Sequence, residues 1–180
     1  MAVQNRLLAV VVALGVAVAA TVAGSAAMAD DGKTTNVLRV RLTSYEEGPA
    51  LSTAGSGQFR AVVDEKAQEI QYRLSYSDLE GSVTQSHIHI GLRAQNGGII
   101  VFLCSNLGNG PEGTQACPAA PATITGTLRP ADVIGPAGQG ITAGEFDELI
   151  AAIRADATYV NVHSTLFQGG EIRAQLDHGH

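Results

Sequence analysis

Three histidines have the side-chain type and the spacing of a metal site. His87 and His89 form a His-x-His pair, and His163 lies far along the chain in a second stretch of alternating residues. On a β-strand, side chains two positions apart point to the same face, about 7 Å apart along the backbone. Imidazole suits copper and zinc, and three protein ligands leave one coordination position open. The residues therefore predict a copper or zinc site at His87, His89 and His163, if the fold brings the two stretches together.

The stretches that carry these histidines each predict a strand with one apolar and one polar face. In residues 86–91, the two histidines alternate with Ile88 and Ile90. Residues 159–176 predict a hairpin around a short glycine-bearing loop, and alternation again separates two sets of side chains. The apolar set is Val160, Val162, Ile172, Ala174 and Leu176, and the polar set is Tyr159, Asn161, His163, Glu171, Arg173 and Gln175.

The polar faces are expected to form one exposed patch on which the three histidines converge. Asn161, Glu171 and Arg173 are the candidates to orient the imidazole rings from beyond the metal's own ligands. Simpler interpretations stay open. The histidines could be ordinary surface residues, with His163 bonded to Glu171 across the hairpin. Glu171 and Arg173 could form a surface ion pair worth under about 1 kcal/mol.

The rest of the chain predicts an all-β domain with one helix. Turn-forming residues separate short alternating segments, which is typical of an antiparallel β-sandwich or barrel. The Asn96-Gly97 pair is expected to turn a hairpin, because both residues tolerate positive φ. Further strands are expected at residues 37–43, 58–63, 68–75, 83–92, 99–104 and 122–128.

The helix is expected to start with a capping box in which Thr142 and Glu145 satisfy each other's backbone amides. It is expected to end near Ala155 and to cover one end of the sheet core. Its apolar stripe has the i, i+3, i+4, i+7 spacing of an amphipathic helix. The stripe consists of Phe146, Leu149, Ile150 and Ile153.

Charge and cysteine usage narrow the class of protein. The 180 residues carry a formal net charge of −6 without a basic run, which argues against nucleic acid as a partner. The two cysteines, Cys104 and Cys117, predict one disulfide in an exported protein. Closing that loop should stabilise the fold by about 3 kcal/mol in the chain-entropy model.

The N-terminus predicts a secretory signal peptide over residues 1–29. An apolar run follows Arg6, and Ala27-Met-Ala29 offers small residues before a cleavage point. The alternative is an uncleaved membrane anchor, because the run is long enough to span a bilayer. After cleavage, no membrane span is expected, and the protein would be secreted, periplasmic or held in the cell envelope. Residues 30–35 then form a flexible lead-in, and residues 177–180 form a tail that carries His178 and His180.

Several motifs together resemble the CHRD domain, a module named for chordin. They are Ser86-His-Ile-His-Ile-Gly91, Gly97-Gly-Ile-Ile-Val-Phe-Leu103, the helix of residues 142–156, Tyr159-Val-Asn-Val-His-Ser164 and Gly170-Glu-Ile-Arg-Ala-Gln-Leu176.

The resemblance covers residues 36–176 and implies an immunoglobulin-like β-sandwich or barrel with one short helix. It implies no settled activity. Chordin's antagonism of growth factors depends largely on separate cysteine-rich domains that this chain lacks, so that function is not carried over. The chain differs from residues that are frequent in the family at Gly98, Ser164, Gln168 and Ala174, none of which is a histidine position.

Three functions fit these observations. The first is a secreted, non-enzymatic binding module for an unknown protein or extracellular ligand, with a surface copper or zinc site at the three histidines. The second is a small copper enzyme that resembles superoxide dismutase, with Arg173 as an anion guide. The third is a structural module of the envelope or matrix without metal. No Ser–His pair or phosphate-binding glycine loop is present to suggest another chemistry.

Overall fold

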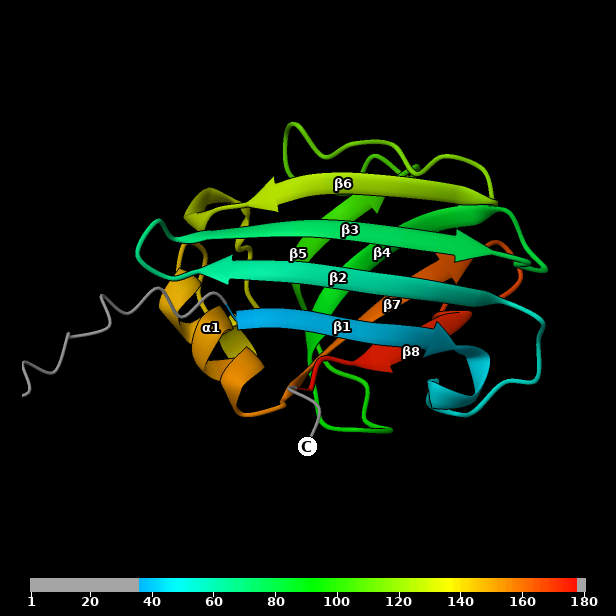
Figure 1. Cartoon of the computed structure of the whole chain (residues 1–180), viewed down its shortest axis with the longest axis horizontal. Helices are drawn as coiled ribbons and strands as arrows, with labels where there is room; N and C mark the ends of the chain where they lie inside the picture. Colours follow the sequence, from blue (N-terminus) through cyan, green and yellow to red (C-terminus); the bar gives the residue numbers. More distant parts are fainter. Residues whose placement is uncertain (1–35, 178–180) are drawn as a thin grey trace, which may run out of the picture. The chain divides into compact units, whose positions relative to one another are not determined.

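The computed structural model describes residues 36–177, which form eight antiparallel strands and one α-helix (Figure 1). The predicted signal segment, the lead-in and the tail histidines lie outside the described residues. Within residues 36–177, no helix has the length and apolar character needed to cross a membrane. The strands are β1 (Asn36–Thr43), β2 (Ser56–Asp64), β3 (Glu69–Ser77), β4 (Val83–Ile90), β5 (Ile99–Ser105), β6 (Ala122–Leu128), β7 (Thr158–Ser164) and β8 (Ile172–Gln175). The helix is α1 (Phe146–Arg154), and short 3-10 turns are η1 (Ser44–Glu46), η2 (Pro130–Asp132) and η3 (Ala137–Gln139).

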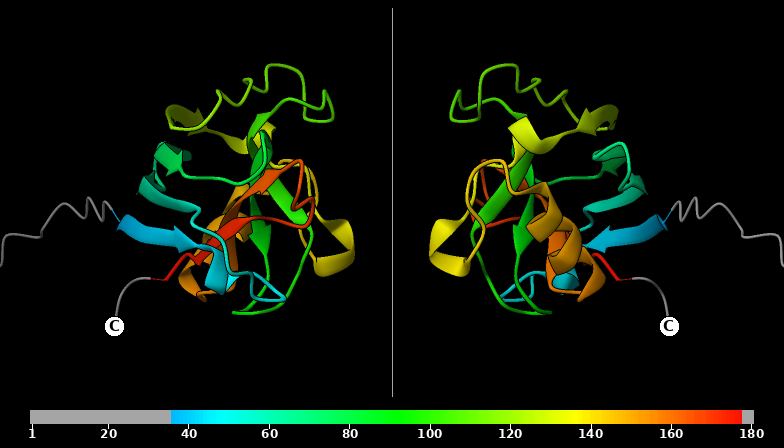
Figure 2. Two further views of the ribbon diagram at one scale, coloured as in Figure 1. Left: turned by 90° about the vertical axis from the view of Figure 1, so that its right-hand side faces the viewer. Right: turned by 90° about the vertical axis from the view of Figure 1, so that its left-hand side faces the viewer.

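One sheet in the order β5-β4-β7-β8-β1-β2-β3-β6 builds the domain. Figures 1 and 2 show that it folds back on itself, so that β4, β5 and β7 form a layer behind β1, β2, β3 and β6. The bend lies between β1 and β8, which pair only at Thr43 and Arg173. Every other neighbouring pair of strands has four or more residue pairs in register. The register is specified because it places the apolar side chains of each strand on the buried face.

The two edge strands, β5 and β6, approach each other and nearly close the sheet into a barrel. The side chain of Gln115 bridges them, because its amide donates to the carbonyl oxygens of Leu103 at 3.2 Å and Thr125 at 3.1 Å. The all-β antiparallel class with one helix is therefore confirmed. The immunoglobulin-like arrangement in particular remains a prediction.

An apolar core fills the space between the two layers. Alternate residues of facing strands, such as Phe59 and Leu74 from one layer and Val160 and Ile172 from the other, are almost fully buried. Burial of each such side chain contributes about 1.5–3 kcal/mol. The helix α1 lies across one end of the layers and buries the predicted stripe, Phe146, Leu149, Ile150 and Ile153.

The start of the helix differs from the prediction. The helix begins at Phe146, and Thr142 belongs to the preceding turn. Half of the expected capping box forms, because the Glu145 carboxylate accepts from the Thr142 amide at 2.7 Å. The reciprocal bond is missing because the Glu145 amide donates to the Thr142 carbonyl oxygen at 3.2 Å instead of to its side chain. Glu145 itself occupies the N-cap, and its side chain makes no capping bond.

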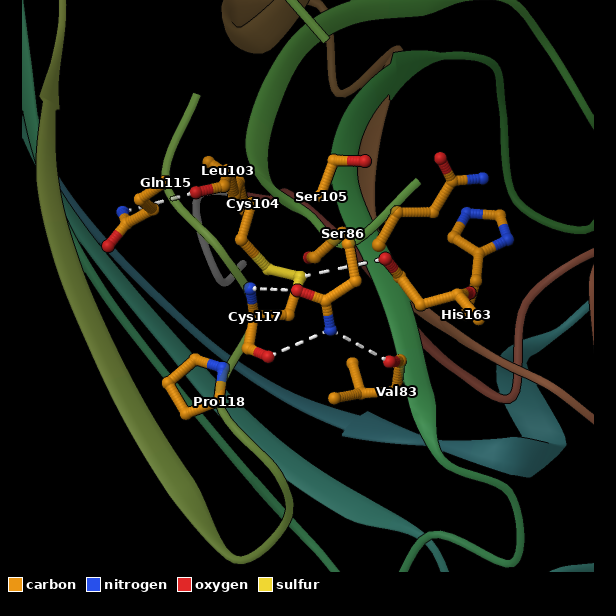
Figure 3. Close-up of a disulfide and its surroundings, with 12 residues drawn as sticks. Val83, Ser86, Leu103, Cys104, Ser105, Gln115, Cys117, Pro118 and His163 are labelled. Carbon is orange, nitrogen blue, oxygen red and sulfur yellow. Dashed lines mark hydrogen bonds between the residues drawn. A yellow bond between two sulfur atoms is a disulfide. The ribbon is translucent and has the colours of Figure 1, made fainter. Parts of the chain in front are cut away.

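The predicted disulfide joins Cys104 of β5 to Cys117, with the two Cα atoms 5.1 Å apart. Asn106 fastens the loop that it closes. The amide group of this side chain donates to the carbonyl oxygens of Val83 and Cys117 and accepts from the Cys117 amide. In Figure 3, dashed lines mark these bonds at the labelled residues Val83 and Cys117. The same view places His163 on the other side of β4 from the sulfur atoms. The disulfide therefore stabilises the apolar side of the sheet behind the histidines.

The hairpin between β4 and β5 forms as predicted, but its turn does not lie at Asn96-Gly97. The chain turns at Leu92–Gln95, where the Gln95 amide donates to the Leu92 carbonyl at 3.0 Å and Ala94 adopts a φ of 61°. Gly97 instead packs against the Ile90 carbonyl, where a Cβ would lie 1.6 Å from the oxygen. Only glycine permits this close approach of the two backbone segments.

Candidate metal centre

The structure brings the three histidines together on neighbouring strands. In the register of β4 and β7, His87 lies opposite Asn161 and His89 lies opposite Tyr159, while His163 is two positions further along β7. One ring nitrogen from each histidine lies within 4.8 Å of the other two. The shortest approach is 3.2 Å, between Nδ1 of His87 and Nε2 of His163. The pairing of β4 with β7 converts two distant sequence motifs into one cluster.

The cluster is buried, so the expectation of an exposed patch was wrong. His87, His89 and His163 are 0%, 7% and 6% exposed. Loops cover the polar face of β4, β7 and β8, and each contributes a specific contact. The loop after β7 supplies the Gln168 carbonyl, the loop after β4 supplies Gly97, and the loop after β1 supplies Glu47.

Backbone carbonyl groups determine the protonation of two of the rings. Nδ1 of His163 lies 2.8 Å from the Gln168 oxygen, and Nδ1 of His89 lies 3.0 Å from the Gly97 oxygen. Since a carbonyl oxygen can only accept, both rings carry their proton on Nδ1 and present a lone pair at Nε2. Nε2 of His163 then accepts from Nδ1 of His87. All three neutral rings thus have the same tautomer.

Two of the resulting lone pairs have no partner. Nε2 of His87 and Nε2 of His89 are buried and accept no hydrogen bond from the described residues. A buried polar atom without a partner costs about 1–3 kcal/mol. The rings of the cluster therefore carry two unsatisfied nitrogen acceptors, which are free to bind an ion.

Aromatic packing holds the rings in place. The Phe102 ring meets His87 edge-on at 4.4 Å, and the Tyr159 ring stacks on His89 at 4.7 Å with an interplanar angle of 2°. The Arg173 guanidinium lies over the Tyr159 ring, with Cζ 3.4 Å from the ring centroid. The Tyr159 hydroxyl accepts from the Gly97 amide at 3.2 Å. Gly97 thus fixes both His89 and Tyr159 through its two backbone groups.

Burial keeps the imidazoles neutral. Desolvation, together with the smaller electrostatic effects of His163 and His89, lowers the pKa of His87 to about 2. Desolvation also lowers the pKa of His89 to about 4, although the hydrogen bond that its ring donates to the Gly97 carbonyl raises it. The pKa of His163 is lowered by the same cause. Near pH 7 the three rings are unprotonated at one nitrogen each, which is the form that binds a metal.

Glu47 is a site residue that the sequence did not reveal. Its carboxyl is 6% exposed, and burial raises its pKa to about 7, against the nearby charge of Arg173 and a hydrogen bond from Asn161, which lower it. At Gly170 a Cβ would lie 2.3 Å from Oε1 of Glu47 and 2.7 Å from Nδ2 of Asn161, so only glycine fits there. Glu47 occupies a loop of Gly, Ser, Thr and Pro in which its neighbour Glu46 is half-buried and paired with Arg93, and no sequence pattern distinguishes the two glutamates.

The three predicted orienting residues have different environments. Asn161 lies between Glu47 and His89, whose pKa values it shifts in opposite directions, and its Oδ1 is buried without a partner. The guanidinium of Arg173 donates to the Leu92 carbonyl at 3.0 Å and to the Asn96 side chain at 3.5 Å. Both residues therefore hold the polar layer around the rings.

Glu171 lies elsewhere. Its carboxylate accepts from the backbone amides of Glu80 at 2.6 Å and Gly81 at 3.4 Å, so it fastens the turn between β3 and β4. The alternative His163–Glu171 bond does not form, because the ring nitrogens of His163 face His87 and Gln168. A surface Glu171–Arg173 pair is also ruled out, because both side chains are buried. Alternation had placed them on a polar face but could not show which loop each side chain meets.

Comparison with known proteins identifies the family. A family model described as the CHRD domain matches residues 38–176, which include all three histidines and both cysteines. No curated protein and no solved structure matched the chain. Because the matched residues cover most of the sequence, the chain belongs to the CHRD domain family.

Proposed function

We propose that this protein is a binding domain whose three buried histidines hold one copper or zinc ion. The observation that carries the proposal is the convergence of three imidazole nitrogens within 4.8 Å, two of the rings having an unpartnered Nε2. Nitrogen ligands of this kind suit copper and zinc. The fourth position stays open for a small ligand such as water.

The spacing of the rings supports a shared ion. With metal–nitrogen bonds of about 2.0–2.1 Å, two nitrogens on one tetrahedral ion lie about 3.3 Å apart. Nδ1 of His87 and Nε2 of His163 are already 3.2 Å apart. A proton now lies between these two atoms, so His87 must either move it to Nε2 or turn that Nε2 to the ion. Metal uptake therefore requires either a change of tautomer or a rotation of the His87 ring, and neither route releases a proton from the neutral imidazole.

The surroundings favour binding over catalysis. The guanidinium of Arg173 was the candidate anion guide for superoxide chemistry, but it is 1% exposed and bonded to Leu92 and Asn96. Loops cover the rings on the side away from the core. The proposal therefore includes no enzymatic step. The Cys104–Cys117 disulfide and the signal-like N-terminus support a location outside the cytoplasm, with an extracellular ligand as partner.

Metal analysis tests the proposal on full-length protein made without an affinity tag. After incubation with Zn²⁺ or Cu²⁺ and removal of free metal, we expect one ion per chain, and thermal denaturation should show a higher Tm in the loaded form. His89→Ala should lose the bound ion. The matched control is the double variant His178→Ala/His180→Ala, which removes two histidines outside the described residues and should bind as the wild type does.

Two results would contradict the proposal. One is wild-type protein that takes up no Zn²⁺ or Cu²⁺ at micromolar concentration. The other is loss of binding in the tail variant while His89→Ala retains it. Near-ultraviolet circular dichroism of each variant separates a lost ligand from a lost fold, because the Tyr159 ring that stacks on His89 reports on the site.

A further inference from the structure

A row of arginines crosses the outer face of the β1–β2–β3 layer, opposite to the histidine cluster. Arg39, Arg60 and Arg73 are direct neighbours in the register of three adjacent strands, and all three side chains are exposed. Arg41 lies on the same face, two positions along β1. Strands are about 4.8 Å apart, so the three guanidinium groups project side by side from one line across the sheet. We call Arg39, Arg41, Arg60 and Arg73 the arginine row.

The arginine row has no carboxylate partner among residues 36–177. Arg93, Arg129 and Arg154, which are also exposed, each form a salt bridge with a glutamate or aspartate. No salt bridge or side-chain hydrogen bond joins the row to any described side chain. The positions that flank it on β2, β3 and β6 are neutral: Gln58, Val62, Gln71, Ser75, Thr123, Thr125 and Thr127.

This arrangement costs stability. Like charges directly opposite on a sheet face are destabilising, and here two such pairs lie in succession, Arg39 with Arg60 and Arg60 with Arg73. The chain as a whole is acidic, with a formal net charge of −6, so the row does not follow from its composition. A row of positive charges that forms no salt bridge within residues 36–177 raises the local concentration of anionic partners.

The chemistry of the face selects the kind of anion. Shallow grooves run beside the row and are lined by guanidinium groups together with the amides and hydroxyls of Gln58, Ser75 and Thr125. Guanidinium groups form bidentate hydrogen bonds with carboxylate and sulfate groups, and amides and hydroxyls form hydrogen bonds with sugar hydroxyls. The exposed positions in these strands include no aromatic residue on which nucleic-acid bases could stack or which could anchor in a bilayer.

The geometry points to a binding surface for an acidic polysaccharide, which lies along the arginine row with its carboxylate or sulfate groups on Arg39, Arg60 and Arg73. This surface is separate from the histidine cluster, because the two lie on different layers of the folded sheet (Figure 2). The inference does not depend on the bound metal. It gives the extracellular binding module a ligand of defined chemistry.

Binding of full-length protein to immobilised polygalacturonate and dextran sulfate tests the inference, with uncharged dextran as the blank. We expect saturable binding to either acidic polymer. The affinity should fall as the salt concentration rises from about 50 to about 200 mM, as it does for other electrostatic binding to polyanions. The triple variant Arg39→Ala/Arg60→Ala/Arg73→Ala should bind at least about tenfold more weakly. Its matched control is Arg93→Ala/Arg129→Ala/Arg154→Ala, which changes the net charge by the same amount and should stay within about twofold of the wild type.

Each other outcome overturns the inference. Equal losses in the two triple variants would show a response to net charge alone. Absence of binding to both acidic polymers would remove the surface. Tighter binding to duplex DNA or to vesicles of anionic phospholipid at the same salt concentration would assign the row to another class of partner. Unfolding in denaturant checks the fold, and the row variant should be at least as stable as the wild type because repulsion is removed.

Discussion

The two outward faces of the folded sheet are both polar, yet they differ in almost every physical property. On the β4–β7–β8 side, loops cover the face, and histidine, amide and guanidinium groups are packed against one another with little exposure. On the β1–β2–β3 side, no loop of residues 36–177 covers the face, and the side chains of the arginine row are exposed. The first face is a closed site of fixed geometry, and the second is an open surface of charge.

The arginines of the two faces differ in the same way as the faces do. Arg173 of β8 lies on the covered face, and its guanidinium is flat on Tyr159 and bonded to the Leu92 carbonyl. Arg60 of β2 lies on the open face, with an arginine on each side and no hydrogen bond or ion pair to a described residue. The same side chain is thus part of the buried framework in one place and a ligand-binding group in the other. What decides its role is the loop above it.

The largest predicted effect follows from this pair. Arg173→Leu should destabilise the protein by about 3–5 kcal/mol, because it leaves Glu47 and the Leu92 carbonyl in a buried layer without the cation. Arg60→Leu, the matched change on the open face, should alter the free energy of unfolding by less than about 1 kcal/mol. Urea unfolding of both variants measures the difference. Equal effects would contradict the division into a covered and an open face.

The second prediction concerns the pH dependence of the covered face. The pKa of Glu47 is raised from 4.5 to about 7 by burial. Between about pH 4.5 and pH 7 the native state therefore binds a proton that the unfolded state has lost, so this group lowers stability as the pH rises. Glu47→Gln removes the titration. We expect the variant to gain about 1.4 kcal/mol per pH unit relative to the wild type over this window, up to about 3 kcal/mol.

The histidines do not obscure this measurement. Their lowered pKa values give the opposite sign, because the unfolded state binds their protons first and stability falls as the pH drops below about 6.5. They are present in both proteins, so their contribution largely cancels in the difference between wild type and Glu47→Gln. Denaturant unfolding at several values between pH 4.5 and pH 7.5 gives the slope. A constant difference would show that the Glu47 carboxyl titrates normally in the folded protein.

Much of the strand framework could be predicted because alternation is a local property of the chain. The expected strand 122–128 coincides with β6, and the alternation of Val160 and Val162 with Asn161 and His163 places the two sets on opposite faces. The disulfide followed from the cysteine count. The convergence of the histidines was also within reach, because it needs only that β4 and β7 be neighbours.

Loop coverage could not be predicted, since it depends on contacts between segments distant in sequence. Asn96-Gly97 looked like a hairpin turn, but Asn96 bonds to Arg173 and Gly48, and Gly97 holds His89 and Tyr159. These contacts with buried residues outweigh the preference of Asn-Gly for a hairpin turn. Glu47 escaped notice for the same reason, and Glu171 was placed near the rings although its partners are backbone amides of another turn.

The arginine row could not be predicted from the sequence for a different reason. Its members are spread over residues 39–73, so the chain contains no basic run. They become a cluster only through the register of β1, β2 and β3, which places Arg39, Arg60 and Arg73 opposite one another. An absence of clustered charge along a β-rich sequence is thus weak evidence against a charged surface. The argument against nucleic acid rests better on the lack of exposed aromatic residues in this face.

The smallest predicted effect tests whether the open face really carries uncompensated repulsion. Arg60→Thr should raise the free energy of unfolding by about 0.2–1 kcal/mol, because it removes both like-charge pairs and inserts a residue that favours strands. Added salt should stabilise the wild type slightly more than this variant, since screening relieves a repulsion that the variant no longer has. Arg129→Thr is the matched control, because Arg129 is paired with Glu69 and its loss should lower stability or leave it unchanged. If Arg60→Thr instead lowers stability at low salt, the guanidinium of Arg60 contributes to the fold, and the contrast with Arg173 is one of degree.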